Sequence, residues 1–229
     1  MTGTAPTAAF VRVVQAISDA SGGVDLAFNG TVAVNGAPFG SYTPAASGTY
    51  ARAPVKPQLT LSATGSTTPF YDKPASTLAA NAPYTIVALG RLTPGAAPAA
   101  TATVLADTTT AANGAVLVRV FNALSYIDAP TGSKVDVYVY PQGAQRPSAP
   151  DATALAFNAA APYLTRTGGN FIIDVFQAGA PSDRPPLFSA SFAGGPAAVR
   201  TVILLDPVAT AQPGTSAYVG SALVLSDQN

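Results

Sequence analysis

Apolar and polar residues alternate in short runs along this chain, and turn-forming residues separate the runs. Residues 24–28 read Val-Asp-Leu-Ala-Phe, which is the period-two pattern of a β-strand with one buried face. Asn29-Gly30 follows directly, and this dipeptide favours a two-residue type I′ hairpin because both residues tolerate a positive φ. The pattern therefore predicts a strand, a tight turn and a returning strand over residues 31–34.

Similar runs cover the rest of the chain and predict about seven or eight strands in each half. In the first half they lie at residues 9–16, 24–28, 31–34, 39–42, 50–55, 58–63, 84–89 and 102–105. In the second half they lie at residues 116–123, 134–140, 154–158, 170–177, 187–192, 199–205 and 218–225. The 21 Pro and 20 Gly residues interrupt the chain too often for long helices, so we expect an all-β protein.

The two halves of the chain repeat each other. Residues 11–18 read Val-Arg-Val-Val-Gln-Ala-Ile-Ser and return at residues 118–125 as Val-Arg-Val-Phe-Asn-Ala-Leu-Ser. The strand at residues 24–28 returns at residues 135–139 as Val-Asp-Val-Tyr-Val. A segment that recurs in the same order after about half of the chain indicates a duplicated structural unit.

Each repeat has the length of an ordinary domain. About 110 residues are enough to bury one hydrophobic core, and turn signals about every ten residues are typical of a sandwich of two sheets. We therefore expect two tandem immunoglobulin-like antiparallel β-sandwich domains related by internal duplication, at residues 1–109 and 110–229.

Alternation also assigns charged residues to the faces of the strands. Arg12 and Asp25 each lie between inward-facing apolar residues, so both side chains point away from the core. Arg119 and Asp136 repeat this placement in the second half. Antiparallel neighbouring strands would bring each Arg opposite its Asp. We therefore predict the structural ion pairs Arg12–Asp25 and Arg119–Asp136, in preference to a substrate-binding role.

Three aromatic residues of the second half share the outward parity, namely Phe121, Tyr138 and Tyr140. Such rings supply rigid apolar area that suits stacking on sugars or docking of another protein. They form a candidate partner or ligand surface, unless the partner domain or a returning loop covers them. The loop at residues 141–150 has no equal in the first half and is either a contact loop or a tolerated insertion.

The composition removes most routes to catalysis. The chain has no His and no Cys, which excludes Ser-His-Asp and Cys-His mechanisms and the commonest transition-metal ligands. All 11 acidic residues are Asp, and they form no Asp-x-Asp-x-Asp-Gly calcium loop. We expect no catalytic residue, no metal and no cofactor, and hence no enzyme. Catalysis by a pair of Asp carboxylates is the chemical alternative.

Charge is sparse and balanced, with 11 basic against 11 acidic residues. Binding to nucleic acid or to an anionic membrane requires a concentration of positive charge, which this sequence lacks. The longest apolar runs, such as residues 199–205, have the length of strands rather than of a membrane span. We therefore expect no nucleic-acid partner and no transmembrane segment.

The repeated segments resemble a known family. The pattern Val-Arg-Val-x-x-Ala-x-Ser, then Val-Asp-Val-Tyr-Val, then Ala-x-Tyr-Thr near the end of the unit, is similar to the bacterial exported repeat known as domain of unknown function 4397, here in two tandem copies. Members carry His where this chain has Gln15 and Asn122. The resemblance implies an exported β-sandwich on the cell surface or in the periplasm, and it implies no reaction.

These observations favour a non-catalytic structural or adhesive module of the cell envelope or extracellular space that self-assembles through its sheet edges. The expected partner is a protein, either a second copy or another envelope component. The alternative is a carbohydrate-binding or accessory module that uses exposed Tyr residues to bind a glycan. Residues 1–7 lack the charged and apolar regions of a signal peptide, so either the protein is cytoplasmic or its signal is absent from this sequence. A composition with no Glu, three Lys and much Thr, Ser, Ala, Gly and Pro suits an exported bacterial surface protein, so we expect a secreted, periplasmic or cell-surface location.

Overall fold

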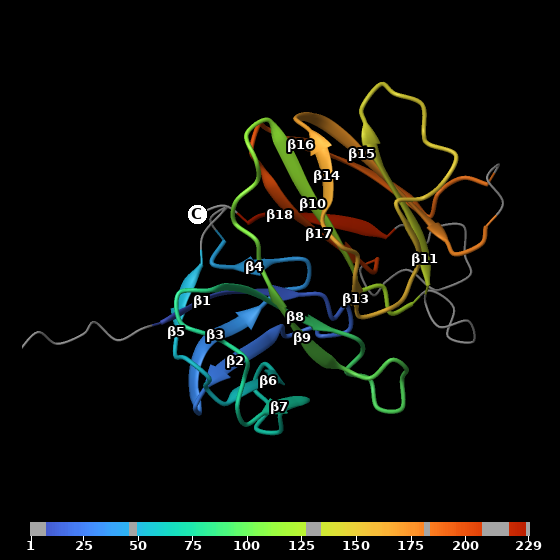
Figure 1. The fold of residues 1–229 in the computed structure, drawn as a ribbon. Helices are drawn as coiled ribbons and strands as arrows, with labels where there is room; N and C mark the ends of the chain where they lie inside the picture. Colours follow the sequence, from blue (N-terminus) through green and yellow to red (C-terminus); the bar gives the residue numbers. More distant parts are fainter. Residues whose placement is uncertain (1–7, 46–49, 127–133, 181–183, 208–219, 228–229) are drawn as a thin grey trace, which may run out of the picture. The chain divides into compact units, whose positions relative to one another are not determined.

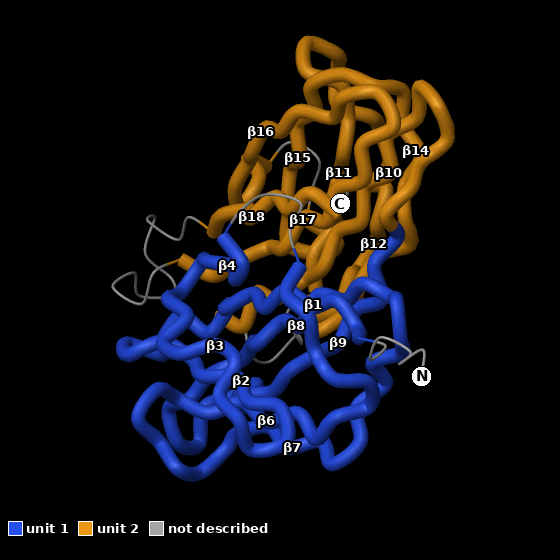
Figure 2. The backbone as a smooth tube through the Cα atoms, turned by 90° about the vertical axis from the view of Figure 1, so that its left-hand side faces the viewer, with its two compact units in different colours: residues 1–108, 229 blue, residues 109–228 orange. Residues whose placement is uncertain are grey.

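The fold is known from a computed structural model that describes residues 8–45, 50–126, 134–180, 184–207 and 220–227 (Figure 1). Within these residues every regular element is a β-strand, which confirms the all-β fold class. The chain divides into two compact units, residues 1–108 and 109–228 (Figure 2). The boundary expected from the sequence, between residues 109 and 110, lies one residue later.

Unit 1 contains two sheets. The first consists of β1 (Ala9–Gln15), β4 (Tyr42–Thr43), β5 (Ala51–Ala53), β8 (Pro83–Leu89) and β9 (Thr101–Ala106), in the order β4-β1-β8-β9 with β5 also paired to β1. The second consists of β2 (Val24–Phe28), β3 (Thr31–Ala37), β6 (Leu59–Ala63) and β7 (Tyr71–Lys73), in the order β3-β2-β6-β7. The predicted hairpin is confirmed, because Asn29 and Gly30 join β2 to β3 with φ angles of 50° and 77°.

Unit 2 has two sheets of the same plan. One consists of β10 (Ala115–Asn122), β13 (Ala159–Ala160), β14 (Leu164–Thr167), β17 (Val199–Leu205) and β18 (Ser221–Ser226), in the order β13-β10-β17-β18 with β14 also paired to β10. The other consists of β11 (Val135–Pro141), β12 (Ala152–Leu155), β15 (Gly169–Gln177) and β16 (Phe188–Gly194), in the order β12-β11-β15-β16. The strand orders of the two units match, which confirms two tandem β-sandwiches that repeat one plan.

The sheets differ from the expectation in one respect, because they are not purely antiparallel. β1 runs parallel to β8, and β10 runs parallel to β17. The turn after β1 leads the chain into the other sheet, so β2 does not pair with β1, and β8 takes the place beside β1. The expectation of antiparallel sheets is wrong at this position in each unit. The other paired strands of the described residues are antiparallel.

Each unit buries a hydrophobic core between its two sheets. In unit 1 the buried cluster joins Val13 and Ile86 of one sheet to Leu26 and Leu61 of the other. The corresponding cluster of unit 2 includes Phe171 and Phe192, whose stacked rings have centroids 5.5 Å apart. Two separate cores are what two independent domains require.

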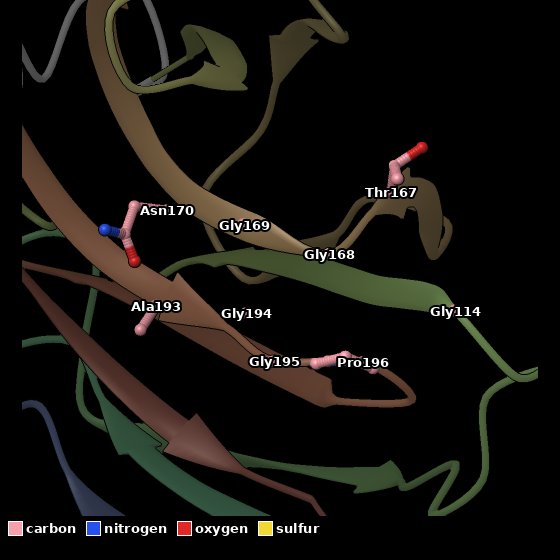
Figure 3. A pocket seen from close by; sticks show the side chains of 9 residues that line it. All are labelled: Gly114, Thr167, Gly168, Gly169, Asn170, Ala193, Gly194, Gly195 and Pro196. Atoms are coloured by element: carbon pink, nitrogen blue, oxygen red, sulfur yellow. The ribbon is translucent and has the colours of Figure 1, made fainter.

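The core of unit 2 leaves no space for a side chain at Gly194, at the end of β16. Figure 3 labels Gly194 and its neighbour Gly195. A Cβ atom at Gly194 would lie 2.8 Å from Cε2 of Phe171 and 2.9 Å from Cγ1 of Val116, whereas a Cβ atom at Gly195 would have nothing within 4 Å. We predict that Gly194→Ala lowers the free energy of unfolding by about 1–3 kcal/mol, because it overpacks the core. Gly195→Ala is the matched control and should change that free energy by less than about 1 kcal/mol. Urea denaturation measures both variants, and equal stabilities would contradict this packing.

Candidate functional site

The predicted ion pairs Arg12–Asp25 and Arg119–Asp136 are wrong. In unit 1 the Arg lies on β1 and the Asp on β2, and these strands belong to different sheets. The same separation holds for β10 and β11 in unit 2. The alternation of residues placed each side chain on the outward face of its strand, but the two strands are not neighbours.

The two Asp residues instead bind backbone groups of their own sheets. Asp25 accepts hydrogen bonds from the backbone N–H of Gly36 at 2.7 Å and from Oγ1 of Thr64 at 2.8 Å. Asp136 accepts hydrogen bonds from the backbone N–H groups of Ala154 at 2.7 Å and Gly179 at 2.9 Å. Both carboxylates therefore stabilise strand ends and turns.

Arg12 lies in a buried network with Thr85, Asp107 and Tyr50. Its side chain is only 1% exposed, and its Nε donates to Oγ1 of Thr85 at 2.8 Å. The Thr85 hydroxyl donates in turn to Oδ2 of Asp107 at 2.6 Å, and Nη2 of Arg12 lies 3.5 Å from the same oxygen. The Tyr50 hydroxyl also donates to that oxygen at 2.9 Å, and its ring centroid lies 5.0 Å from the guanidinium carbon.

Arg119, Thr201, Asp227 and Tyr163 form the same network in unit 2. Nη2 of Arg119 donates to Oγ1 of Thr201 at 2.8 Å, and that hydroxyl donates to Oδ2 of Asp227 at 2.6 Å. The Tyr163 hydroxyl donates to the same carboxylate oxygen at 3.1 Å, with its ring centroid 4.9 Å from the guanidinium carbon. The duplication has therefore preserved a complete set of four interacting side chains.

The four members occupy equivalent places in both units. The Arg lies on the first strand, and the Thr lies opposite it on the parallel neighbour. The Asp directly follows the last strand of the sheet, and the Tyr precedes the short strand on the other side of the first strand. A buried charge that loses its partner is strongly destabilising, so this network, here called the Arg-Thr-Asp-Tyr network, holds one sheet of each unit in a single register.

The predicted aromatic surface is wrong for two of its three members. Phe121 is fully buried, and Tyr140 is only 9% exposed. The Tyr140 hydroxyl donates to Oδ2 of Asp174 at 2.9 Å. Burial raises the pKa of Tyr140, and the hydrogen bond to Asp174 and its negative charge raise it further, against a smaller opposite effect of Arg146.

Tyr138 keeps the outward orientation but is covered by the loop at residues 141–150. The Arg146 guanidinium carbon lies 5.4 Å from the ring centroid of Tyr138 and 4.6 Å from that of Phe176. The two rings meet edge to face with centroids 5.5 Å apart. Nη1 of Arg146 also lies 3.9 Å from Oδ2 of Asp174. The loop therefore packs on the aromatic face, which is the alternative that the sequence left open.

A shallow groove of about 470 Å³ lies at one end of unit 2 (Figure 3). Five of its nine lining residues are glycines, and the others are Thr167, Asn170, Ala193 and Pro196. None of these side chains titrates near neutral pH, so the groove offers backbone groups and a small apolar surface but no acid or base.

A cluster of acidic residues that could bind a metal ion is missing from the part of the chain that the structure describes. No three acidic residues approach one another closely enough there to hold a metal ion. The described residues also include no helix that could span a membrane. The Asp carboxylates with known contacts bind backbone groups, hydroxyls, Arg side chains or, at Asp72, the side-chain amide of Gln58.

Comparison with known protein families gives one match. The family described as domain of unknown function DUF4397 matches the chain over residues 9–138, which cover the strands of unit 1 and continue into β11. The chain belongs to this family. No curated protein matches it.

Two buried amides stand where the resemblance to DUF4397 implies His. Gln15 accepts a hydrogen bond from the backbone N–H of Ile17 and donates Nε2 to the carbonyl of Ile17 at 3.1 Å. Asn122 accepts from the backbone N–H of Leu124 at 3.0 Å and donates to the carbonyl of Leu155 at 2.9 Å. A neutral imidazole also has one donor and one acceptor. The amides can therefore replace it without leaving the backbone unpaired.

One Asp in each unit of this DUF4397 protein links the loops that follow the parallel strands. In unit 1 Asp19 follows β1 and accepts hydrogen bonds from the backbone N–H groups of Leu92 and Thr93, at 2.9 Å each. In unit 2 Asp206 follows β17 and accepts a hydrogen bond from the backbone N–H of Ser125 at 2.9 Å. Both units therefore join the loop after the first strand to the loop after its parallel neighbour. The carboxylate lies on the first of these loops in unit 1 and on the second in unit 2.

Replacement of a network Arg should destabilise its unit strongly. We predict that Arg12→Met lowers the free energy of unfolding of unit 1 by about 3–5 kcal/mol, because the buried Asp107 loses its positive partner. Lys56→Met removes an exposed positive charge of the same unit and should change that free energy by less than about 0.5 kcal/mol. Hydrogen exchange of the amides in β1 and β8 measures the effect for unit 1 alone. If Arg12→Met were as stable as the control, the Arg-Thr-Asp-Tyr network would not have the role assigned to it.

The contribution of Asp19 to stability should depend on pH. Burial raises the pKa of Asp19, but hydrogen bonds from Leu92 and Thr93 outweigh burial and hold the pKa below its ordinary value. A lowered pKa stabilises the fold above the pKa of the unfolded chain, about 3.9, and the stabilisation disappears as the pH falls through the folded pKa. We predict that the stability difference between wild type and Asp19→Asn shrinks below about pH 4.

Thr93→Val is the companion variant for this measurement, because it removes the hydroxyl that donates to Oδ2 of Asp19 at 2.7 Å. It should weaken the pH dependence without abolishing it. Urea denaturation at a series of pH values tests both variants. A difference that stays constant with pH would exclude the titration of Asp19 as its cause.

Proposed function

We propose that this chain is a non-catalytic structural or adhesive module of the cell envelope or extracellular space. In this proposal it associates with a second copy, or with another envelope protein, through the open edges of its sheets. We also propose that its two units are tandem copies of the DUF4397 domain. The shared strand order and the repeated Arg-Thr-Asp-Tyr network support that second point.

One sheet edge carries the proposal. β16 of unit 2 has seven residues and no charged side chain. Its counterpart in unit 1, β7, has three residues, of which Asp72 and Lys73 are charged. Edge strands present unpaired backbone N–H and C=O groups, and natural sheets protect them with charges, short strands or bulges. β7 has the first two protections, whereas β16 has neither.

The opposite edges of the same two sheets are better protected. β3 and β12 each pair with an irregular register, and a bulge bends an edge strand away from a flat partner. Val32 of β3, at 57% exposed, is the single exposed large hydrophobic side chain within the described ranges. One such residue does not form an apolar patch, so backbone pairing at β16 has better support than hydrophobic docking at β3.

The alternative of a carbohydrate-binding module has no comparable support. It depends on exposed aromatic rings, but Phe121 and Tyr140 are buried and Arg146 lies over Tyr138. The glycine-lined groove contains no aromatic ring and no carboxylate, which are the groups that bind sugars most often.

The proposed location outside the cytoplasm rests on the family resemblance and on a composition with no Glu and three Lys. Fractionation of cells that carry the native gene tests it. Recovery of the protein in the cytoplasmic fraction would contradict this part of the proposal.

The association itself should be measurable in solution. We predict reversible self-association when the protein concentration rises from about 1 µM to about 1 mM in sedimentation velocity experiments. Since β16 has no charged side chain, the association should change little between about 0.1 M and 1 M salt, where surface charges are screened. A monodisperse monomer over the whole concentration range would count against assembly through sheet edges.

A further inference from the structure

We propose that β16 pairs antiparallel with β16 of a second copy, around a two-fold axis at Ala190. The pairing would join the two four-stranded sheets β12-β11-β15-β16 of both copies into one continuous sheet. This inference rests on the proposed function and specifies the edge, the partner and the register.

β16 is a regular strand at the margin of its sheet. Its register with β15 runs without a shift from Phe188, opposite Val175, to Gly194, opposite Gly169. In Figure 2, β16, β15 and β11 follow one another across unit 2. No strand among the described residues pairs with β16 on the side away from β15. An edge strand of regular register can accept another strand along its length.

One hydrogen bond indicates which backbone groups face outward. Nε of Arg200 donates to the carbonyl of Ala193 at 3.2 Å, so this carbonyl points away from β15. The N–H and C=O groups of one residue in an antiparallel strand point to the same side, and the side alternates from residue to residue. The backbone groups of Ser189 and Ser191 therefore also face away from β15. The side chains of both serines are exposed.

These outward groups select the register. A two-fold axis at Ala190 places Ser189 opposite Ser191 of the second copy, and Ser191 opposite its Ser189. Each of these two pairs exchanges both of its backbone hydrogen bonds. Neither pair uses the carbonyl of Ala193, which accepts the hydrogen bond from Arg200.

The side chains agree with the same register. Residues 188–192 read Phe-Ser-Ala-Ser-Phe, a sequence that is identical in both directions and therefore complementary to itself in an antiparallel pair. Ala190 lies opposite Ala190 of the second copy, where the two Cα atoms are about 4.5 Å apart. This short distance suits a small side chain. Phe188 lies opposite Phe192 of the second copy, and both side chains remain in the core of their own unit, where they are 5% and 8% exposed. No like charges meet, because β16 has none.

A second copy fits this edge better than another partner strand would. Because residues 188–192 are complementary to themselves, a second copy of this chain is sufficient as the partner. The equivalent strand of unit 1 is a poorer template, because β7 has three residues, of which Asp72 and Lys73 are charged, whereas β16 has seven residues. The contact therefore closes on itself as a dimer and does not continue into a fibre.

Cysteine crosslinking tests the register directly, because the chain has no cysteine of its own. Ser189→Cys and Ser191→Cys are made as separate proteins, and each is oxidised alone and in an equimolar mixture. In the proposed register residues 189 and 191 of different copies have Cα atoms about 5.5 Å apart, within reach of a disulfide. Identical residues are diagonal neighbours at about 7–8 Å, which is too far. The mixture should form a disulfide-linked dimer, and neither variant alone should.

Ser191→Pro tests the contribution of the backbone. The N–H of Ser191 faces outward, so proline at this edge position removes a donor of the dimer and no hydrogen bond to β15. Two of the four hydrogen bonds of the dimer would disappear, and the dissociation constant should rise about tenfold or more. The unfolding temperature of the monomer at low concentration checks that this variant folds.

The outcomes separate this inference from the proposed function. Crosslinking in the mixture together with weaker association of Ser191→Pro supports the β16 dimer. Crosslinking of either variant alone, or association of the wild type that Ser191→Pro leaves unchanged, overturns the β16 register but leaves assembly through another edge in place. A wild type that stays monomeric up to about 1 mM overturns both.

Discussion

A buried guanidinium group loses its hydrogen bonds to water, and groups of the protein must replace them. Each unit of this chain contains one such group. Arg12 and Arg119 are compensated only when three parts of the sheet occupy one register, namely the first strand, its parallel neighbour and the residue after the last strand. A slip by two residues would keep the same side chains facing the core, because side chains alternate with a period of two. The Arg-Thr-Asp-Tyr network makes one of these registers much more favourable than the others.

The two units form an internal comparison, because one plan has been built twice with different details. The cores, the strand orders and the buried networks agree. The loop carboxylates changed place, from Asp19 on one loop to Asp206 on the other, and the edge strands changed in length and charge. Features needed for folding are thus shared, and features at the periphery differ between the halves.

Most strands could be predicted because period-two alternation reports one buried face, and the Asn29-Gly30 turn fixed the β2–β3 hairpin. β7 and β14 escaped detection, since short polar sequences such as Leu-Thr-Arg-Thr show no such alternation. Alternation assigns a residue to a face of its strand but does not assign the strand to a sheet. The predicted Arg12–Asp25 pair is wrong for this reason. The recurrence of Asp at the end of residues 104–107 and 224–227 was the available signal for the true partners. The parity of Tyr138 was right, but no sequence pattern could position Arg146 on its ring.

The parallel pairing of the first strand with the penultimate one has a consequence for biosynthesis. Arg12 bonds to a residue 73 positions later, and Arg119 to one 82 positions later. Contacts of such long sequence separation slow folding, because a large loop must close before they form. As the chain emerges from its N-terminus, neither sandwich can close until nearly its whole length is available, yet the N-terminal one can close before its twin has emerged. Duplication in tandem therefore lets two slowly folding domains form one after the other, which limits the time in which their unpaired strands coexist.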